Sequence, residues 1–220
     1  MNGLKRQRSL LKMNKDAITH LKSADNKLAA VIDRIGDLEI HHREDPFCFL
    51  VGEIVGQMIS NSVRKVIFER LTLLCKGEIT PEKIHSLTVD QIRTTGMSFA
   101  KASYIHNLAL LTMQGTVDFD KLSTMDDLQV IKYLRNIKGV GDWTAKMFLI
   151  FYLGREDVVP YEDGAFLQAY KWLYNARSLK PKSIIRRCKC WSPYSSYGAR
   201  FLYAALDRGL TKEDVGTIIL

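Results

Sequence analysis

The chain has 220 residues, with 32 lysine and arginine residues against 24 aspartate and glutamate residues, which gives a formal net charge of +8. Hydrophobic residues make up 46% and charged residues 25%, so collagen-like, intrinsically disordered and disulfide-scaffold proteins are excluded. No apolar run approaches the ~18 residues of a membrane span, and the basic start is not followed by the apolar stretch of a secretory signal. The four cysteines predict free thiols in a reducing intracellular compartment, and the positive charge favours a polyanionic partner.

Nearly every long segment has the periodicity of an amphipathic helix, which predicts an all-α fold. An apolar stripe from Phe47 to Met58, preceded by Asp45 and Pro46, predicts one helix with a defined start. Short helices are expected to begin at Thr80-Pro81-Glu82 and at Thr88, where Gln91 completes a capping box. The longer helices are expected, in chain order, over 15–34, 46–58, 61–75, 99–113, 125–135, 142–153, 164–174, 181–188 and 196–207.

The stretch from Leu134 to Lys146 contains two glycines separated by one residue, where one predicted helix ends and the next begins. Glycines allow a positive φ and a close backbone approach, and free amides at a helix start favour an anion such as phosphate. The alternative is a tight turn between helices without a ligand role. Asp142 is interpreted as the cap of the second helix. Phosphate binding is favoured by the basic residues around the glycines, which are Arg135, Lys138 and Lys146.

The segments 134–145 (LRNIKGVGDWTA) and 159–163 (VPYED) resemble the signature of the helix-hairpin-helix (HhH-GPD) DNA glycosylases, most closely the 3-methyladenine DNA glycosylase II group. Three further stretches agree in order: 45–60 (DPFCFLVGEIVGQMIS), 92–105 (IRTTGMSFAKASYI) and 191–203 (WSPYSSYGARFLY). The resemblance implies an all-α, two-lobed fold with a central DNA-binding cleft. We expect a single glycosylase unit over 1–220, with one helical lobe over about 53–155 and a second lobe formed by 1–52 and 156–220. Because the first 43 residues leave no room for the N-terminal sheet domain of larger relatives, a compact form is expected.

The resemblance assigns the catalytic carboxylate to Asp163. Breaking an N-glycosidic bond builds positive charge on the sugar, which an ionised carboxylate stabilises while it orients or deprotonates the attacking water. Glu162 is the neighbouring competitor, but the spacing of the family motif places the role on the second acid. For an isolated acidic pair before a helix, the alternative is a helix cap that interacts with the helix dipole.

Trp143 separates two subclasses of the family. Relatives that also cut the strand carry a lysine at this position, whose amine forms a Schiff base with the sugar, so an indole implies a monofunctional enzyme that leaves an abasic site. With Met147 one turn further on and Tyr203 opposite, the resemblance places Trp143 in a base pocket. An aromatic face attracts the cationic alkylated purines 3-methyladenine and 7-methylguanine. The alternative is that Trp143 and Met147 are core residues, and a Met in place of the family's aromatic implies a narrow choice of substrate.

The resemblance also implies contacts with DNA and with a cation. The turn residues Lys138, Gly139, Val140 and Gly141 are expected to bind phosphate. Met58, next to Gln57, occupies the position of an apolar wedge that fills the gap left by the extruded nucleotide, although its place in the apolar stripe also fits a core residue. Ser60 and Asn61 are expected to contact the sugar or the opposite base. A monovalent cation, Na⁺ or K⁺, would bind the main-chain carbonyls of Arg135, Ile137 and Val140, and no iron–sulfur cluster or other cofactor is expected.

Together these features predict a DNA glycosylase of base excision repair that removes alkylated purines from duplex DNA by base flipping. Two alternatives stay open: a glycosylase for another damaged base, and a non-catalytic helix-hairpin-helix DNA-binding module. The expected partner is double-stranded DNA with a damaged base, the expected state is a monomer without membrane contact, and the expected location is intracellular and DNA-associated.

Overall fold

The computed structural model describes residues 10–41 and 45–219, and the fold is almost entirely helical, as predicted. The chain forms two compact units: unit 1 consists of residues 1–42 and 154–220, and unit 2 consists of residues 43–153. The boundary expected between residues 52 and 53 therefore lies at 42/43. The reason is that α3 (Pro46–Gly56) packs as one piece against other helices of unit 2 and cannot be divided.

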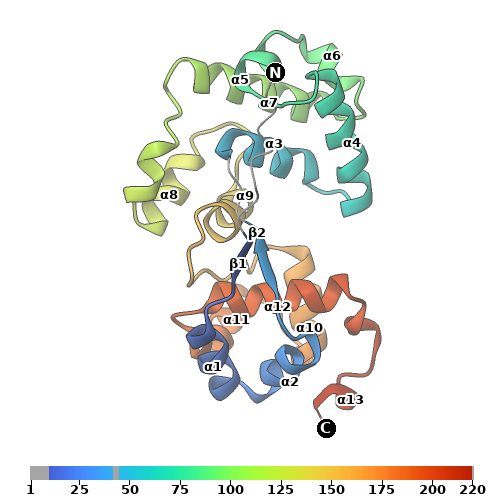
Figure 1. Cartoon of the computed structure of the whole chain (residues 1–220), viewed down its shortest axis with the longest axis vertical. Helices are drawn as coiled ribbons and strands as arrows, with labels where there is room; N and C mark the ends of the chain where they lie inside the picture. The colour runs from blue at the N-terminus through green and yellow to red at the C-terminus, as the bar shows by residue number, and fades with distance from the viewer. Residues whose placement is uncertain (1–9, 42–44, 220) are drawn as a thin grey trace. The chain divides into compact units, whose positions relative to one another are not determined.

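Unit 2 is built around α3, which contacts α4, α7 and α9 (Figure 1). Its apolar residues are buried on nearly all sides, as expected for a helix at the centre of a core. The other elements of the unit are α4 (Asn61–Leu74), α5 (Pro81–His85), α6 (Val89–Arg93), α7 (Phe99–Met113), the 3-10 helix η1 (Asp120–Thr124), α8 (Asp127–Leu134), α9 (Asp142–Met147) and the π-helical segment η2 (Phe148–Tyr152).

A partly buried ion pair joins α4 to α3. Arg64 Nη2 donates to Glu53 Oε1 at 2.6 Å, and the Glu53 side chain is 8% exposed. The arginine passes over Gly56, where an added Cβ would lie 2.8 Å from Arg64 Cδ. Removal of Arg64 would leave the buried Glu53 carboxylate without this partner, which is destabilising. The absence of a side chain at Gly56 thus leaves room for the Arg64 side chain to lie against α3.

The helix starts expected in unit 2 are confirmed. Asp45 accepts a hydrogen bond from Cys48 N at the start of α3, and Thr80 caps α5. Thr88 and Gln91 form the predicted capping box at α6, with distances of 2.8 and 3.1 Å. Ser98 caps α7 through Lys101 N. Local side-chain chemistry therefore sets these boundaries.

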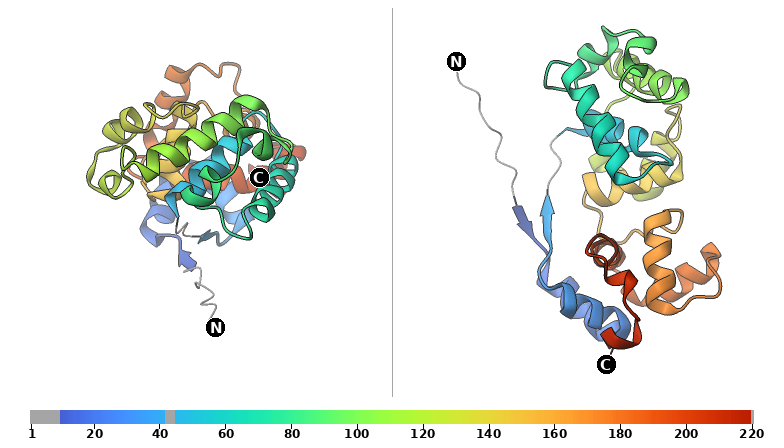
Figure 2. Two further views of the ribbon diagram at one scale, coloured as in Figure 1. Left: turned by 90° about the horizontal axis from the view of Figure 1, so that it is seen from above. Right: turned by 90° about the vertical axis from the view of Figure 1, so that its right-hand side faces the viewer.

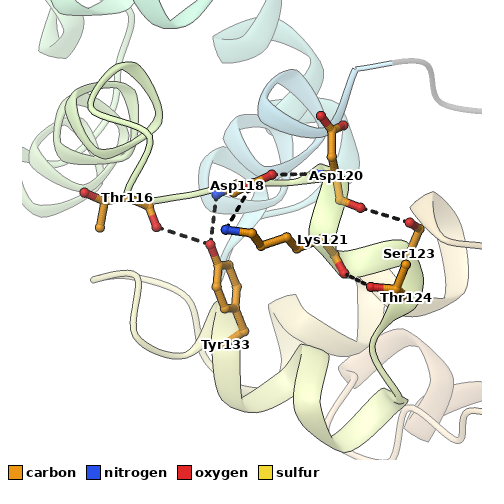
Figure 3. A network of polar contacts seen from close by, with 7 residues as sticks. All are labelled: Thr116, Asp118, Asp120, Lys121, Ser123, Thr124 and Tyr133. Carbon is orange, nitrogen blue, oxygen red and sulfur yellow. Dashed lines mark hydrogen bonds and ion pairs between the residues drawn. The ribbon is translucent and has the colours of Figure 1, made fainter.

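A polar network holds the segment between α7 and α8 (Figure 3). The Tyr133 hydroxyl of α8 accepts from Asp118 N at 2.8 Å and donates to Thr116 O at 3.2 Å. Lys121 of η1 donates to the Asp118 carboxylate at 3.1 Å and holds the pKa of this carboxyl below its usual range. Ser123 and Thr124 close the 3-10 turn on the carbonyls of Asp120 and Lys121. Tyr133 thereby fixes the helix that leads into the glycine turn.

Unit 1 packs its helices around an aromatic core. Here α12 contacts α10 and α2, and the indole of Trp191 is fully buried. The elements are α1 (Lys15–Ala24), α2 (Asn26–Ile35), α10 (Gly164–Tyr174), α11 (Pro181–Cys188), the 3-10 helix η3 (Lys189–Trp191), α12 (Ser195–Asp207), the 3-10 helix η4 (Leu210–Lys212) and α13 (Gly216–Ile219).

A two-stranded ribbon completes unit 1 (Figure 2). Strands β1 (Leu10–Lys12) and β2 (Glu39–His41) pair antiparallel, with Leu11 opposite Ile40. Strands of three residues are too short to give an alternating pattern, which is why the helical expectation missed them. Within residues 10–41 and 45–219, no helix is long and apolar enough to span a membrane.

The helices expected over 61–75, 125–135 and 196–207 are observed with ends displaced by one or two residues. Three other differences have an identifiable structural form. The helix expected over 15–34 is two helices, because the Asp25 carboxylate accepts from Lys27 N and Leu28 N and starts a new helix. The helix expected over 46–58 ends at Gly56. The helix expected over 142–153 changes from α to π at Phe148, whose ring stacks on that of Tyr152 with 4.6 Å between centroids.

Candidate functional site

The glycine turn between α8 and α9 has the geometry of a close backbone approach. Gly139 has a φ of 91°, and a Cβ at this position would overlap the Tyr104 ring of α7. Gly141 precedes α9 without a side-chain cap hydrogen bond, and a Cβ there would meet open space. Gly141 thus places no side chain of its own over the first amides of α9, an arrangement that suits backbone recognition of phosphate. Gly139 is needed for packing, whereas Gly141 leaves room for a ligand.

The charges around this turn differ from the expectation. Asp142 does not cap α9; its carboxylate pairs with Arg135 Nε at 3.3 Å, and both side chains are about half exposed. Lys146 is buried at 7% exposure, so it does not flank the turn as an exposed cation. Lys138 is exposed. Of the three expected basic neighbours, Lys138 has the most favourable position for a phosphate.

The segment after α3 exposes a large apolar side chain. Met58 is 100% exposed and has a φ of 57°, the left-handed conformation. The interpretation of Met58 as part of the core stripe is therefore wrong. Ser60 caps α4 through Val63 N at 3.4 Å, and the exposed Asn61 is the first residue of α4. We call residues 57–60 the Met58 turn.

Gln57 joins the Met58 turn to the glycine turn. Its Nε2 donates to Gly139 O at 2.8 Å and to Thr144 Oγ1 at 3.2 Å. Lys101, on α7, donates to Val55 O and Gln57 O at 2.9 and 2.6 Å. The structure thus brings together two segments that the sequence placed in separate motifs, about eighty residues apart.

Lys101 and Tyr104 were missed as contributors to this region. Both lie in the stretch 92–105, which resembles the family but suggested no role for either. One signal was available: Lys101 lies in the first turn of α7, where the helix dipole disfavours a cation. A lysine in that position needs a compensating partner, and the carbonyls at the end of α3 provide it.

The two α9 residues expected in the base pocket differ in exposure. Trp143 is half-buried, and Met147 is 4% exposed. Met147 therefore takes part in the packing of unit 2, and at most one edge of it reaches solvent. The indole is the more accessible of the two side chains. This makes Trp143 the better candidate for contact with a base.

In unit 1, Asp163 starts α10. Its carboxylate accepts from Phe166 N at 2.7 Å, and the residue is 9% exposed, whereas Glu162 is exposed. Asp163 therefore does cap a helix, as the alternative interpretation of the acidic pair predicted. A capping bond to Oδ1 fixes the orientation of the carboxylate and does not prevent a catalytic role. The choice of Asp163 over Glu162 selects the buried and oriented acid of the pair.

Phe166 brings Asp163 and Tyr203 into one region of unit 1. The Phe166 amide holds the carboxylate, and its ring packs against the Tyr203 ring with 6.5 Å between centroids and 60° between planes. Arg200, one turn before Tyr203 on α12, was not foreseen. Burial lowers the pKa of Arg200 to about 10, with Tyr197 and Tyr203 acting against this shift, so the guanidinium is charged at neutral pH. Tyr203 therefore has both the Phe166 ring and the charged Arg200 guanidinium in its surroundings.

The cysteines give no sign of a metal centre. Cys75 and Cys188 are buried, and burial raises the pKa of both thiols. Cys190 is exposed. Among the described residues, no group of three or more histidine, cysteine, aspartate or glutamate side chains is arranged to hold a metal ion.

Comparison with known proteins gives the family. A family model described as "HhH-GPD superfamily base excision DNA repair protein" matches residues 51–193. The chain belongs to this family. The matched range contains the Met58 turn, the glycine turn and Asp163, whereas Tyr203 lies after it.

Individual members of the HhH-GPD superfamily match over most of their length. DNA-3-methyladenine glycosylase 1 of Schizosaccharomyces pombe is 24% identical over 84% of this chain and 84% of its own. The crystal structure of a DNA-3-methyladenine glycosidase from Bacillus halodurans is 30% identical and has a TM-score of 0.75, covering 90% of this chain and 92% of the other. The S. pombe 3-methyladenine DNA glycosylase Mag1, in complex with abasic DNA, has a TM-score of 0.78 over 88% of this chain and 97% of its own, at 24% identity, and so shares the fold.

Proposed function

We propose that the protein is a monofunctional DNA glycosylase of base excision repair that hydrolyses the N-glycosidic bond of alkylated purines in duplex DNA. The observation that carries this proposal is the similarity to a Bacillus halodurans DNA-3-methyladenine glycosidase at 30% identity over nine-tenths of both chains. The similarity to DNA-3-methyladenine glycosylase 1 of S. pombe, which covers 84% of each chain, also supports it. A protein of this activity is DNA-associated in the cell.

Asp163 is the catalytic carboxylate in this proposal. Departure of the base leaves positive charge on the deoxyribose, and a fixed anion stabilises that charge without reorganisation during the reaction. The same oxygen atoms orient the attacking water and accept its proton. The hydrogen bond from Phe166 N supports this role, because it holds the carboxylate in one orientation before substrate arrives.

Trp143 and Tyr203 would recognise the base by its charge. Alkylated purines such as 3-methyladenine and 7-methylguanine are cationic, and the face of an aromatic ring attracts a cation. The same charge makes the base a good leaving group. The half-buried state of both rings supports the proposal, since each retains accessible surface, whereas the buried Met147 would contribute at most one wall.

The proposed partner is duplex DNA, bound by a monomer. The turn from Gly139 to Gly141 would bind phosphate through the amides of its two glycines, since the Val140 amide donates to Ile137 O, and the exposed Lys138 would add a charge. Such contacts give weak sequence preference and a steep dependence on salt. Met58 would fill the gap left by the extruded nucleotide, with Ser60 and Asn61 near the strand. The side-chain amide of Gln57 donates to Gly139 O, so we propose that Gln57 supports the glycine turn and does not contact a base.

No lyase step is proposed, because the position of the Schiff-base lysine holds Trp143. Lys146, three residues on, is 7% exposed. Borohydride should therefore trap no covalent adduct with DNA that contains an abasic site. A good yield of adduct would contradict this part of the proposal.

A monovalent cation at the carbonyls of Arg135, Ile137 and Val140 is also a proposal. The turn fits it, because the Ile137 carbonyl accepts from Val140 N at 3.0 Å and a carbonyl oxygen has a second lone pair for a cation. The cation would bring positive charge to a bound phosphate. The protein residues that hold it would be these main-chain carbonyls alone.

The function is tested by incubation of the protein with N-methylated duplex DNA, followed by chromatography of the free bases released. We expect release of 3-methyladenine with little release from unmethylated, deaminated or oxidised duplex. Release from the deaminated or oxidised duplex alone would favour a glycosylase for another damaged base. Binding without any release would favour the non-catalytic DNA-binding module.

A further inference from the structure

The Met58 turn keeps a conformation that a methionine does not adopt on its own. A left-handed backbone at a residue with a Cβ costs free energy and persists only where the surroundings hold it. Because Met58 is 100% exposed, its own side chain contributes no packing that would hold the turn. The support must come from contacts made to the main chain next to Met58.

Lys101 supplies that support from outside the turn. Its ammonium donates to Val55 O at 2.9 Å and to Gln57 O at 2.6 Å, so it binds the last carbonyls of α3 and the residue directly before Met58. These carbonyls form the negative end of the α3 dipole, which compensates a cation. Burial lowers the pKa of Lys101 below its usual range, as expected for an ammonium withdrawn from solvent. Lys101 thus acts as a side-chain cap for the end of α3.

The same residue is connected to the glycine turn. Lys101 fixes the main chain of Gln57, and the Gln57 side chain donates to Gly139 O and Thr144 Oγ1. Tyr104, one turn after Lys101 on α7, packs against Gly139. One face of α7 therefore holds both segments that the proposed function places on DNA.

We propose that Lys101 is a positioning residue, which presets the Met58 turn so that Met58 projects before DNA binds and keeps this turn in register with the glycine turn. This inference rests on the proposed function only in that Met58 enters DNA; it does not depend on which base is removed. It predicts that loss of the ammonium leaves affinity for DNA in place but removes the ability to unstack it.

The test uses a duplex with 2-aminopurine beside an abasic-site analogue, because the fluorescence of 2-aminopurine rises when the base loses its stacking. Four proteins are compared with wild type: Lys101→Met, Lys101→Arg, Met58→Ala and the double variant of Lys101→Met with Met58→Ala. Lys83→Met serves as the matched control, since Lys83 is a lysine of the same unit that donates to Glu78 instead. Far-UV circular dichroism and DNA affinity are measured for each protein.

We expect wild type and Lys83→Met to give the full rise in fluorescence. Lys101→Met should fall to the level of Met58→Ala, the double variant should fall no further, and Lys101→Arg, which can still donate to both carbonyls, should restore most of the rise. The spectrum and the affinity of Lys101→Met should match those of Lys83→Met. A full rise with Lys101→Met, or a loss of fluorescence that is matched by loss of affinity or of helix content, overturns the inference.

The two proposals fail in different ways. If wild type raises the fluorescence but releases no alkylated base, the proposed function fails and Lys101 is still judged by its variants. If wild type gives no rise, Met58 does not enter the duplex and the inference on Lys101 is overturned, whatever bases are released.

Discussion

Asp25 and Asp163 are two aspartates of unit 1 with similar positions at the start of a helix. Each precedes a helix, each is 9% exposed, and each carboxylate accepts backbone hydrogen bonds from the first turn. Asp25 binds Lys27 N and Leu28 N at 3.1 Å, and Asp163 binds Phe166 N at 2.7 Å. Burial and capping therefore do not tell a structural acid from a catalytic one.

Asp25 also has partners far along the chain. Asp25 also accepts from the Tyr174 hydroxyl at 2.6 Å and from Trp191 Nε1 at 3.1 Å, so side chains from two distant elements converge on it. Tyr174 is the last residue of α10, the helix that Asp163 starts. One acid thus anchors the far end of α10 while the other orients its beginning. The comparison teaches that stability and rate have to be measured separately for each.

The largest effect is expected for Asp163→Asn. The amide oxygen can still cap α10, so the free energy of unfolding should change by less than about 1 kcal/mol. The charge that stabilises the sugar cation is lost, and the rate of base release should fall by about a hundredfold or more. Urea unfolding and single-turnover release of 3-methyladenine measure the two quantities. Equal release by both proteins would remove Asp163 from the mechanism.

Asp25→Ala should lower stability and leave the rate of base release nearly unchanged, the reverse of Asp163→Asn. The substitution leaves the Tyr174 hydroxyl, the Trp191 indole N–H and two backbone amides without their buried acceptor, and a loss of about 3 kcal/mol in unfolding free energy is expected. Base release per folded molecule should stay within a small factor of wild type. Were Asp25→Ala to retain full stability and lose activity, the contrast between the two acids would be reversed.

The sequence predicts what local chemistry decides, and unit 2 illustrates this. The starts at Asp45, Thr88 and Ser98 follow from side chains within three residues of the amides that they cap. The glycine turn is equally local. The end of α3 is not, because the apolar stripe continues through Met58 and periodicity does not show where a helix stops.

What the sequence did not predict depends on partners distant along the chain. Asp25 falls in an apolar stripe with Leu21 and Leu28, so the pattern predicts one helix through it. The acceptor role of Asp25 becomes visible only when Tyr174 and Trp191, 149 and 166 residues away, are placed beside it. In the candidate site, the role of Lys101 could not be predicted for a similar reason. Its partners are main-chain carbonyls distant along the chain, and every residue type has a main-chain carbonyl.

Tyr174→Phe tests one hydrogen bond of Asp25 by itself, and a smaller loss of stability is expected than for Asp25→Ala. The hydroxyl donates to a carboxylate, so its removal should lower the unfolding free energy by about 1.5 kcal/mol. The cation–π contact of the Arg187 guanidinium, 5.0 Å from the ring centroid, can be kept by phenylalanine, so the loss is confined to the hydrogen bond. Trp191→Phe removes the other side-chain donor together with part of a fully buried ring, so a larger loss is expected for it. No change in either variant would mean that Asp25 is held by its backbone amides alone.

The same residue predicts a pH dependence. Burial, and then Asp25, raise the pKa of Tyr174 above its usual value. The folded state therefore keeps the phenol protonated where the unfolded chain ionises it, so this contribution is complete below pH ~10 and is lost as pH rises above it. Urea titrations at alkaline pH should show a shallower fall in stability for Tyr174→Phe than for wild type. An identical slope would contradict the raised pKa.

The smallest effect is expected at Asp126, an exposed aspartate that starts α8 in a capping box with Gln129. Asp126→Ala should lower the unfolding free energy by about 1 kcal/mol and leave base release per folded molecule unchanged. Gln129→Ala, which removes the reciprocal bond, should cost less. Because α8 leads into the glycine turn, this is a stringent control for Asp163. If Asp126→Ala lowered the rate as far as Asp163→Asn does, base release would respond to any change at a helix start, and the rate effect at Asp163 would no longer identify a catalytic carboxylate.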